Sequence, residues 1–297
     1  MRYLLISAVV LLSAPGVGAG ELTTAAKPPE ISPEMKRLIG DYQRGAERLI
    51  VFERDGQILI REGDHERPYE PPRGWTREKV AAVYRIVPQR PVASIMAAVR
   101  GQQPPPETGR EHPALVELSR LEPTLKLEIR YASRDNFLGT PVYHEGRAFL
   151  ERSATEALVR AHRALDKYGY GLLIHDGYRP WWVTKVFWEA TSKREREFVA
   201  DPAKGSRHNR GSAVDLTLFD RATGQAVEMP GGYDEMSERS HPSYPGGTSL
   251  QRWRRDLLRA AMEQEGFTVN PVEWWHFDNR GWQRYALENL SFDQIEK

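Results

Sequence analysis

The stretch from Ser206 to Phe219 constrains this chain most, because it joins a polar loop to a strand with two unlike faces. Period-two alternation divides the strand into Ala213, Asp215 and Thr217 on one face and Val214, Leu216 and Leu218 on the other. Such a strand holds Asp215 rigidly against the loop that carries His208, seven positions earlier. Zinc and similar borderline metals bind nitrogen and oxygen ligands together, so this pair is half of a candidate metal site.

A second pair of ligand-type side chains comes from Glu273 and His276. His276 would be a third ligand, and three protein ligands leave the fourth position of zinc open for water, as in catalytic sites. Zinc lowers the pKa of such a water toward ~7, and Glu273 suits the base that takes its proton. Positions three apart on a flat strand face opposite ways, so this segment needs a helical turn or a bulge for both side chains to converge. Spacing alone is weak evidence, because a single histidine is more often an ordinary surface or core residue.

Composition narrows the chemistry of the chain. Its 297 residues contain no cysteine, which excludes disulfides, thiolate metal sites and cysteine nucleophiles, so any metal must be held by His, Asp and Glu. The 42 Lys and Arg residues nearly balance the 41 Asp and Glu residues, and this balance gives no indication of a nucleic-acid partner.

Residues 1–19 have the pattern of a secretory signal peptide. Arg2 precedes an apolar run from Leu4 to Leu12, and small residues follow up to Ala19, where we expect cleavage. The alternative is a membrane anchor, but the run is too short to span a bilayer, and a lipoprotein anchor would need a cysteine. From Gly20 onward no segment is long and apolar enough to cross a membrane. We therefore expect a periplasmic or secreted protein with no membrane span in its mature form.

The remaining chain divides into two predicted units. Residues 20–34 have the composition of a linker, and residues 35–105 form a small β-rich accessory module in which Asp55-Gly56 marks a two-residue hairpin. The proline-bearing segment 101–106 marks the boundary, and residues 106–297 are expected to form the domain that holds the candidate metal site. Strands and helices mix there without regular alternation, which indicates an α+β fold with a mixed or antiparallel sheet, flanking helices and the zinc site.

Hydrophobic periodicity predicts individual elements within these units. The expected strands cover residues 125–131, 171–176 and 213–219, and the expected helices cover residues 151–168, 181–198 and 250–266. Gly169 is expected to end the first of these helices. Residues 80–86 form either a further strand or a short helix.

The ordered motifs of the second unit resemble those of one enzyme family. Residues 206–215 match the signature Ser-x-His-x-x-Gly-x-Ala-x-Asp of the zinc D-alanyl-D-alanine dipeptidases, the VanX-type enzymes. Further segments similar to this family, in the family's order, are Asp135-Asn136-Phe137, Gly139, Pro141-Val142-Tyr143, Asp176-Gly177-Tyr178-Arg179-Pro180, Asp234 to His241 and Glu273 to His276. The resemblance extends over residues 113–277, and residues 20–106 have no counterpart in the minimal enzyme.

The resemblance implies a chemical role for several positions. It implies one zinc ion per chain with three ligands, His208, Asp215 and His276. It also implies that Glu273 is the general base and that Arg179 polarises the scissile carbonyl. A guanidinium stays charged, and one donor aimed at an oxyanion lowers the barrier by ~3 kcal/mol. The alternative for Arg179 is a salt bridge to Asp176 or to a surface acid.

Three further positions are implied to contact the substrate. Ser206 and Asp234 match positions that recognise the free amino group in the family, and an anion facing an ammonium suits a dipeptidase that requires a free N-terminus. Asp234 lies in a polar loop, so an ordinary solvated charge is the alternative. Tyr178, like Tyr143, would line the pocket, and core packing is the alternative for both.

The remaining histidines are expected to have ordinary roles. His175 lies on the short apolar strand 171–176 and is expected in the core or beside the site, and His241 is expected to support the site. The other four, His65, His112, His144 and His162, are expected at the surface.

The resemblance therefore implies zinc-dependent hydrolysis of the dipeptide D-Ala-D-Ala to two D-alanines in cell-wall metabolism. One alternative is a D,D-carboxypeptidase or another peptidoglycan-stem peptidase, which would keep the metal but open the amine end of the pocket. Another is a non-catalytic cell-wall or metal-binding protein, which would be expected to lack Glu273 or Arg179. An exported enzyme would meet wall-derived dipeptide, which favours recycling over resistance. No pattern in the sequence indicates an oligomeric state.

Overall fold

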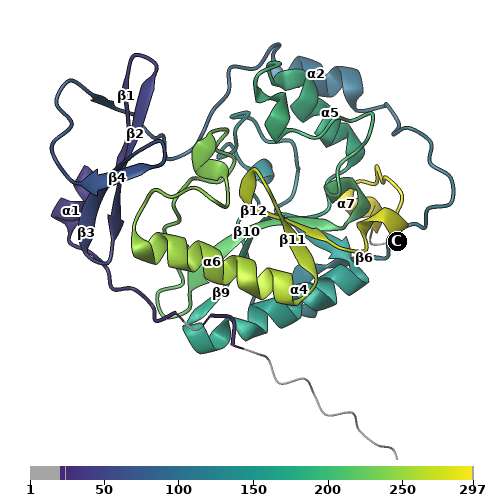
Figure 1. The fold of residues 1–297 in the computed structure, drawn as a ribbon. Helices are drawn as coiled ribbons and strands as arrows, with labels where there is room; N and C mark the ends of the chain where they lie inside the picture. The colour runs from purple at the N-terminus through teal and green to yellow at the C-terminus, as the bar shows by residue number, and fades with distance from the viewer. Residues whose placement is uncertain (1–20, 24, 296–297) are drawn as a thin grey trace, which may run out of the picture.

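The computed structural model describes residues 21–23 and 25–295, which form two five-stranded sheets, a two-stranded sheet and several helices (Figure 1). The second five-stranded sheet, with the helices around it, belongs to the larger unit. The expected signal peptide lies outside the described residues. Among the residues that are described, no helix is long and apolar enough to cross a membrane. The mixture of mostly antiparallel sheets and helices confirms the predicted α+β class.

A short helix and five strands form the N-terminal unit. They are α1 (Pro33–Leu38), β1 (Gly40–Arg44), β2 (Glu47–Arg54), β3 (Gln57–Glu62), β4 (His65–Pro68) and β5 (Thr76–Arg77). The strands pair antiparallel in the order β4-β3-β2-β1-β5. Asp55 and Gly56 both have positive φ, as a two-residue hairpin requires, so the predicted turn is confirmed. The small core of this unit consists of Leu49, Val51 and Ile60.

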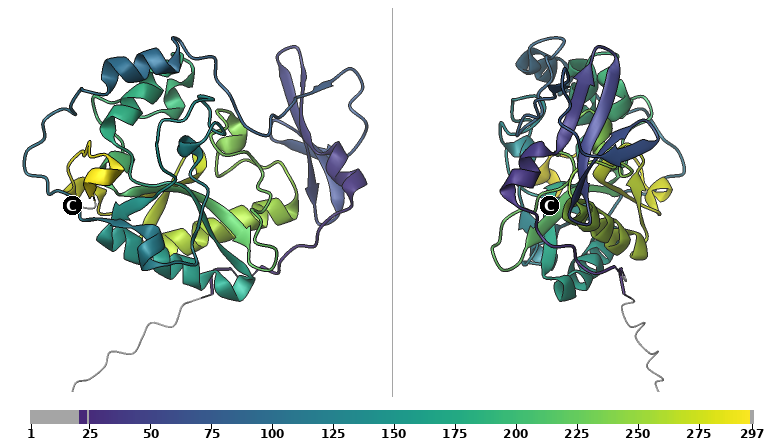
Figure 2. Two further views of the ribbon diagram at one scale, coloured as in Figure 1. Left: turned by 180° about the vertical axis from the view of Figure 1, so that it is seen from behind. Right: turned by 60° about the vertical axis from the view of Figure 1, so that its left-hand side comes forward.

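The larger sheet carries the residues that matter for function. Its strands are β7 (Lys126–Leu127), β9 (Tyr170–Asp176), β10 (Ala213–Asp220), β11 (Phe267–Asn270) and β12 (Glu273–Asn279), in the order β11-β12-β10-β9-β7. Only the short β7 runs parallel to its neighbour. The helices α4 (Arg152–Ala164) and α6 (Ser249–Gln264) lie side by side along one face of this sheet (Figures 1 and 2).

The predicted alternation along β10 is confirmed. Val214, Leu216 and Leu218 belong to the main apolar core, and Asp215 faces the other side of the sheet. The register places Asp215 directly between Asp176 on β9 and His276 on β12. Residues directly opposite on antiparallel strands share a face, so three neighbouring strands present a row of polar side chains away from α4 and α6.

Smaller elements surround the sheet. The helices are α2 (Val92–Val99), α3 (Leu118–Leu121), α5 (Trp181–Ala190) and α7 (Phe292–Ile295), and β6 (Leu115–Glu117) pairs with β8 (Phe149–Glu151). The 3₁₀ turns are η1 (Arg130–Ala132), η2 (Asp166–Tyr168), η3 (Glu195–Phe198), η4 (His208–Arg210), η5 (Glu238–Ser240) and η6 (Trp282–Arg284).

Several predicted elements are shorter than expected. The strand at 125–131 is limited to Lys126–Leu127, because the chain turns into η1 after Ile129. The helix at 181–198 ends at Ala190, where Thr191 is extended, and only η3 continues it. The helix at 151–168 continues as η2 and ends at Gly169 with φ 79°, as predicted. Residues 80–86 form neither a strand nor a helix.

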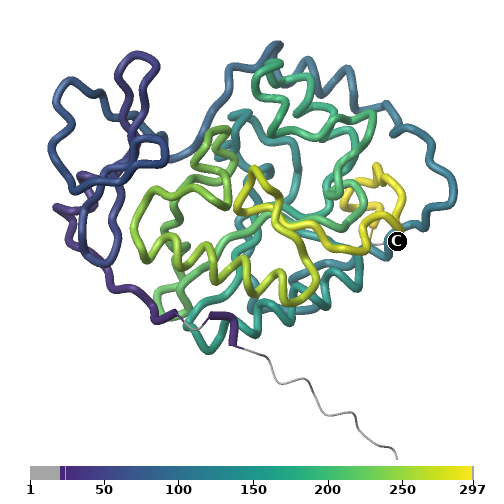
Figure 3. The backbone as a smooth tube through the Cα atoms, viewed as in Figure 1, coloured from purple at the N-terminus to yellow at the C-terminus, as the bar shows by residue number. Residues whose placement is uncertain are grey.

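The hydrophobic packing divides the chain earlier than the expected boundary at 101–106. Ile86, Val92, Ile95 and Val99 lie in the core of the larger unit, because α2 packs against α5. Figure 3 shows the chain leaving the N-terminal sheet and reaching α2. It then passes along the side of the larger unit that is opposite the N-terminal sheet. The proline-bearing segment 101–106 therefore connects two parts of the same core, and the packing favours a division between Arg77 and Ile86.

Candidate metal centre

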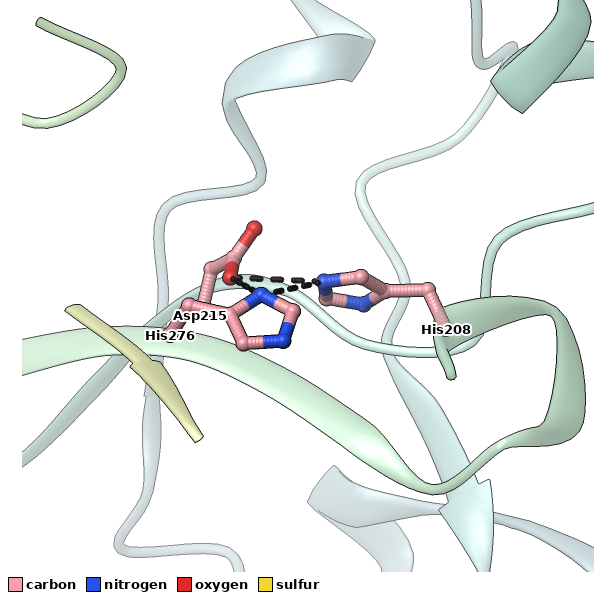
Figure 4. Close-up of side chains that lie close together, drawn as sticks. All are labelled: His208, Asp215 and His276. Atoms are coloured by element: carbon pink, nitrogen blue, oxygen red, sulfur yellow. Dashed lines mark hydrogen bonds and ion pairs between the residues drawn. The ribbon is translucent and has the colours of Figure 1, made fainter. Parts of the chain in front are cut away.

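Three side chains from separate elements meet above the polar face of the larger sheet (Figure 4). Asp215 comes from β10, His276 from the adjacent position on β12, and His208 from η4, which precedes β10. All three are buried. The structure thus brings together the three residues that the sequence predicted as ligands.

The three ligand-type atoms lie close together. Asp215 Oδ1 is 3.0 Å from His276 Nδ1 and 3.3 Å from His208 Nε2, and the two nitrogens are 3.2 Å apart. Asp215 Oδ1 accepts no hydrogen bond although it is buried. Burial works against a charged carboxylate, but His208 and His276 outweigh it and hold the pKa of Asp215 well below its usual range. Two imidazole nitrogens and one carboxylate oxygen that converge in this way fit a zinc ion.

The outer nitrogen of each imidazole has its own partner. His208 Nδ1 is 2.7 Å from the carbonyl oxygen of Gly177, and His276 Nε2 is 2.9 Å from Asp278 Oδ1. A proton on each outer nitrogen leaves His208 Nε2 and His276 Nδ1 free to bind a metal. Sequence reasoning missed Asp278, although its place two residues after His276 on the same strand puts both side chains on one face.

The turn that brings His208 to the strand depends on Gly211. Its φ of 61° is in the left-handed region, and a Cβ atom there would lie 2.4 Å from Leu115 Cδ2 and 3.1 Å from the Glu151 nitrogen. The carbonyl oxygen of Gly211 accepts a hydrogen bond from that same Glu151 nitrogen at 2.8 Å. Gly211 therefore forms the turn between His208 and Asp215.

Glu273 reaches the centre through an irregular pairing of β11 with β12. Val269 pairs with Phe277, and the next residue, Asn270, pairs with Glu273, so three residues of β12 have no partner on β11. This is the bulge that convergence required. A carboxylate oxygen of Glu273 lies 3.7 Å from His276 Nδ1 and accepts a hydrogen bond from the Asn270 side chain at 2.7 Å. Burial, partly opposed by His276, raises the pKa of Glu273 to about 7.

Arg179 is buried beside the centre and is paired with two acids. Its guanidinium donates to Asp176 Oδ2 at 2.9 Å, and it lies 3.6 Å from Asp215 Oδ2. The hydroxyl of Tyr143 donates to the other oxygen of Asp176 at 2.9 Å. The salt bridge to Asp176 that the sequence offered as an alternative is therefore present, and Arg179 also lines the cavity at the centre.

This cavity has a volume of about 430 Å³ and contains nearly all of the predicted site residues. Those lining it are Arg179, Ser206, His208, Asp215, Asp234, Glu273 and His276. Ser206 is buried, and its hydroxyl accepts a hydrogen bond from the His208 backbone N–H at 3.2 Å. Tyr178 does not line the cavity: its ring contacts Phe292 and its hydroxyl donates to the carbonyl of Leu290. The core-packing alternative holds for Tyr178.

Asp234 is not an ordinary solvated charge. It has a φ of 56°, in the left-handed region, and its Oδ1 accepts a hydrogen bond from the Tyr131 hydroxyl at 3.0 Å. Its other oxygen, Oδ2, is buried and has no hydrogen-bond partner. Burial, together with the charge of Asp215, raises the pKa of Asp234 well above its usual range. A cation placed next to Oδ2 would relieve this unfavourable burial.

Two tyrosines of the site were missed from the sequence. Tyr131 lines the cavity and donates to Asp234, and the Tyr233 hydroxyl donates to Asp215 Oδ2 at 3.2 Å. No local pattern distinguishes them from the other aromatic residues. Both depend on the Asp234 loop folding back onto the sheet, which spacing alone does not reveal.

The other histidines lie away from the ligand cluster. His175 is buried, as expected, and its ring stacks on Tyr233. His65, His112 and His144 are exposed, as expected. The prediction is wrong for His162, which is fully buried. Its ring lies between α4 and β9, where it accepts a hydrogen bond from the Leu172 backbone N–H at 3.0 Å.

A buried centre of two histidines and one aspartate, with a carboxylate beside it and a cavity in front, defines a metallopeptidase. A family model described as D-ala-D-ala dipeptidase matches residues 111–295. The chain belongs to this D-ala-D-ala dipeptidase family, as its ordered motifs indicated, and is an enzyme.

Two relatives show the extent of the similarity. The D-alanyl-D-alanine dipeptidase of Escherichia coli is 38% identical over 164 residues, which are 55% of this chain and 83% of that protein. The D-alanyl-D-alanine dipeptidase of Enterococcus faecium is 34% identical over 171 residues, which are 52% of this chain and 85% of that protein. The family match begins at residue 111, after the N-terminal sheet and α2.

Proposed function

We propose that the chain hydrolyses the dipeptide D-Ala-D-Ala to two D-alanines with one bound zinc ion. One observation carries this proposal: a single cavity is lined both by the three ligand residues and by Asp234, whose buried Oδ2 has no partner. The free amino group of a dipeptide is the cationic group that this oxygen requires. The family and the names of the relatives agree with this substrate.

Zinc would be held by His208, Asp215 and His276, whose free acceptor atoms converge within 4.8 Å of one another. When bound, zinc supplies a Lewis acid and lowers the pKa of water toward ~7. The remaining work is done by side chains of the chain itself.

Glu273 is proposed to move the proton. Asn270 donates to one of its carboxylate oxygens and thereby fixes the orientation of the group. The carboxylate can take a proton from the attacking water and pass it to the amine that leaves. Its place beside His276 keeps this transfer within the cavity.

Arg179 is proposed to stabilise negative charge on the carbonyl oxygen of the substrate. Asp176 holds the guanidinium from one side, so the group is oriented before the substrate arrives. A fixed donor of this kind lowers the barrier by ~3 kcal/mol.

The amine end of the substrate is proposed to bind at Asp234 and Ser206. Tyr131 occupies Asp234 Oδ1, which leaves Oδ2 for the ammonium. A charge-assisted hydrogen bond in a buried place gives both affinity and a requirement for a free amine. A carboxypeptidase acting on a stem peptide would have to pass the peptide chain across this buried acid, and this is why we favour the dipeptidase.

Three substrates test the proposal with the purified, zinc-loaded enzyme. We expect free D-Ala-D-Ala to be cleaved, and N-acetylated D-Ala-D-Ala to be cleaved about 10- to 100-fold less efficiently, because a hydrogen bond to a charged group is lost. A stem peptide ending in D-Ala-D-Ala should be equally poor. Equal cleavage of all three would assign the carboxypeptidase activity instead, and no cleavage of any would leave a binding protein.

Export through a signal peptide at residues 1–19 is part of the same proposal. The enzyme would then act on dipeptide released from the cell wall, in the periplasm or outside the cell. N-terminal sequencing of the protein from cell fractions tests it: a mature protein in the periplasm or medium that begins at Gly20 supports export, and full-length active enzyme in the cytosol contradicts it.

A further inference from the structure

The N-terminal sheet contacts the loop that carries Asp234. We define the Asp234 loop as residues 230–248, between β10 and α6. The backbone N–H of Glu53, on β2, donates to the carbonyl oxygen of Gly247 at 3.1 Å. The hydroxyl of Tyr244 donates to the carboxylate of Asp41, on β1. The last residues of the loop are therefore bonded to two neighbouring strands of the N-terminal sheet.

Glu53 joins the sheet to the start of α6. Its side chain is buried, and one carboxylate oxygen accepts from the Ser249 backbone N–H at 2.7 Å. The other oxygen accepts from the Gly56 backbone N–H at 2.7 Å. One carboxylate thus accepts hydrogen bonds from a backbone N–H of the β2–β3 turn and from a backbone N–H in the first turn of α6, which has no partner within the helix. Arg252 adds a further link, because it donates to the carbonyl oxygens of Glu53 at 2.6 Å and Gly247 at 3.0 Å.

Tyr244 is fixed on both sides of the contact. Its backbone carbonyl accepts a hydrogen bond from Arg255 on α6 at 2.7 Å. Its ring lies so close to Gly246 that a Cβ atom there would be 2.2 Å from the hydroxyl. The Tyr244 ring is therefore packed directly against the backbone at Gly246, which has no side chain.

Backbone hydrogen bonds link Tyr244 to the part of the loop near Asp234: the N–H of Tyr244 donates to the His241 carbonyl at 3.0 Å, and the N–H of His241 donates to the Glu238 carbonyl at 3.1 Å. Glu235 is buried, and its carboxylate accepts a hydrogen bond from the Gly232 N–H at 2.9 Å and forms an ion pair with Arg239 Nε at 3.0 Å. The neighbouring Asp234 holds a left-handed backbone conformation, which a non-glycine residue keeps only when its surroundings enforce it. The segment from Gly232 to Arg239 is thus one bonded unit.

The N-terminal sheet and the rest of the enzyme have separate hydrophobic cores. The core of the sheet consists of Leu49, Val51 and Ile60. A cleft of about 330 Å³ lies between the sheet and the loop. Polar contacts, among them those of Glu53 and Asp41, therefore contribute to the attachment, and single substitutions can test them.

We propose that the N-terminal sheet is a positioning element for substrate recognition: Glu53 and Asp41 hold the Asp234 loop so that Asp234 meets the free amine of the dipeptide. This inference rests on the proposed role of Asp234. It gives residues 40–77, which precede the region of the family match, a part in selecting the substrate.

Two variants of the full-length, zinc-loaded enzyme test the proposal. Glu53→Ala removes the carboxylate that accepts from Ser249 at the start of α6, and Tyr244→Phe removes only the hydroxyl that donates to Asp41. In both we expect KM for D-Ala-D-Ala to rise about tenfold, the effect of roughly one hydrogen bond to a charged group, with kcat within about threefold of wild type. The preference for free over N-acetylated dipeptide should fall by the same factor. Zinc content should not change.

Glu62→Ala is the matched control, because Glu62 is an acid of the same sheet whose exposed side chain pairs with Arg67. It should leave KM unchanged. Hydrogen exchange of the backbone amides in residues 231–247 should become faster in both variants and not in the control. This readout does not depend on activity.

The outcomes distinguish the positioning role of the N-terminal sheet from the proposed role of Asp234. Unchanged exchange in the loop, or faster exchange with unchanged KM and unchanged substrate preference, would overturn the positioning role while leaving the dipeptidase in place. A wild-type enzyme that does not prefer the free dipeptide would overturn the proposed role of Asp234, and the positioning role with it. If Glu53→Ala does not fold, Tyr244→Phe alone tests the positioning role, because it removes only the hydroxyl group and keeps the aromatic ring.

Discussion

At the scale of single residues, the two oxygens of Asp215 have different partners. Oδ1 faces the two imidazole nitrogens, whereas Oδ2 accepts from Tyr233 at 3.2 Å and lies 3.6 Å from Arg179. The carboxylate therefore connects the proposed metal position with the residue that is proposed to stabilise the oxyanion. A change at Asp215 would disturb both, so the contributions of neighbouring residues are better tested one at a time.

Glu273→Gln tests the proposed base. Glutamine keeps the size of the side chain, so zinc binding through His276 and the other ligands should be retained. It cannot take a proton, and kcat should fall by about 10²- to 10⁴-fold. Steady-state kinetics with zinc content measured on the same sample checks this. Glu263→Gln, on the surface of α6, is the control, and a wild-type kcat for Glu273→Gln would remove Glu273 from the base role.

Asp278→Ala tests how His276 is oriented. Asp278 accepts the proton of His276 Nε2 at 2.9 Å, so its loss leaves the ring free to turn and lowers the basicity of Nδ1. We expect the affinity for zinc to fall about 10- to 100-fold, measured by competition with a metal-binding dye. Asp256→Ala, at an exposed position of α6, should bind zinc as the wild type does. Equal affinity of Asp278→Ala would mean that the ring is held by packing alone.

The sequence was sufficient for some residues of the site and not for others, for physical reasons. His208, Asp215, Glu273 and His276 could be predicted because each belongs to a local motif. Tyr178 belongs to a motif too, but a local pattern does not say toward which side of a loop the ring turns, and here it turns to the core.

At the scale of elements, the site depends on the register of three strands. Asp176, Asp215 and His276 occupy one row across β9, β10 and β12. His208 is added by the η4 turn, which ends at Gly211. The geometry of this turn therefore decides whether the third ligand reaches the row.

Gly211→Ala should destabilise the protein and weaken zinc binding. A left-handed conformation costs a non-glycine residue about 1–2 kcal/mol, and the added methyl group would also collide with Leu115 and approach the Glu151 nitrogen. We expect a loss of about 2 kcal/mol or more in the free energy of unfolding, measured by urea denaturation. Gly45→Ala is the matched control, because Gly45 has φ 63° with open space around it. Equal losses in the two variants would contradict the proposed collision.

His162 makes the contact between α4 and β9 sensitive to acid. Its Nδ1 accepts from the Leu172 backbone N–H, and burial, followed by the charge of Arg221, lowers the pKa of His162 to about 4. The unfolded chain, with an ordinary histidine pKa near 6.5, then binds more protons than the folded chain between about pH 6.5 and 4. Stability due to this residue is complete above pH 6.5 and falls as the pH drops, by up to ~1.4 kcal/mol per pH unit.

His162→Asn should therefore make unfolding less dependent on pH. The asparagine oxygen can still accept from the Leu172 N–H, and it does not titrate. Urea unfolding at pH 7 and at pH 4.5 should show a smaller loss of stability on acidification for the variant than for the wild type, by about 2 kcal/mol. Because both proteins contain the same metal centre, its own acid sensitivity cancels. An identical loss would contradict this origin. His65→Asn, at an exposed position, should behave as the wild type.

The elements that were predicted well are those whose signal is local. The alternation of β10, the Asp55-Gly56 hairpin and the end of α4 at Gly169 depend on a few neighbouring residues. The strand expected at 125–131 is cut short because the chain turns into η1 after Ile129. The η1 turn places Tyr131 where its hydroxyl donates to Asp234, which is distant in the sequence. No local pattern in the sequence predicts this contact.

At the scale of the whole molecule, two hydrophobic cores lie on either side of one loop. The Asp234 loop contacts the N-terminal sheet through Tyr244 and Gly247, and it contacts the site through Asp234 itself. The boundary expected at 101–106 differs from the one that the packing favours. Prolines indicate an exposed connection, but they do not indicate which parts of the chain it connects. Here it connects α2 with β6, and both belong to the larger unit.

Removal of the metal should affect the two cores unequally. With a chelator, the acceptor atoms of His208, Asp215 and His276 would face one another without a cation, so hydrolysis should cease and the larger unit should lose stability. A ligand present at ~100 times its Kd adds ~2.7 kcal/mol to the folded state, and Tm should fall accordingly on chelation.

The N-terminal sheet has its own core, so hydrogen exchange in residues 40–62 should change little, whereas exchange around 206–216 and 273–279 should become faster. Addition of zinc should restore activity, Tm and exchange together. Hydrolysis that persists in metal-free enzyme would contradict the mechanism, and uniform exchange changes in both units would show that the two cores unfold as one.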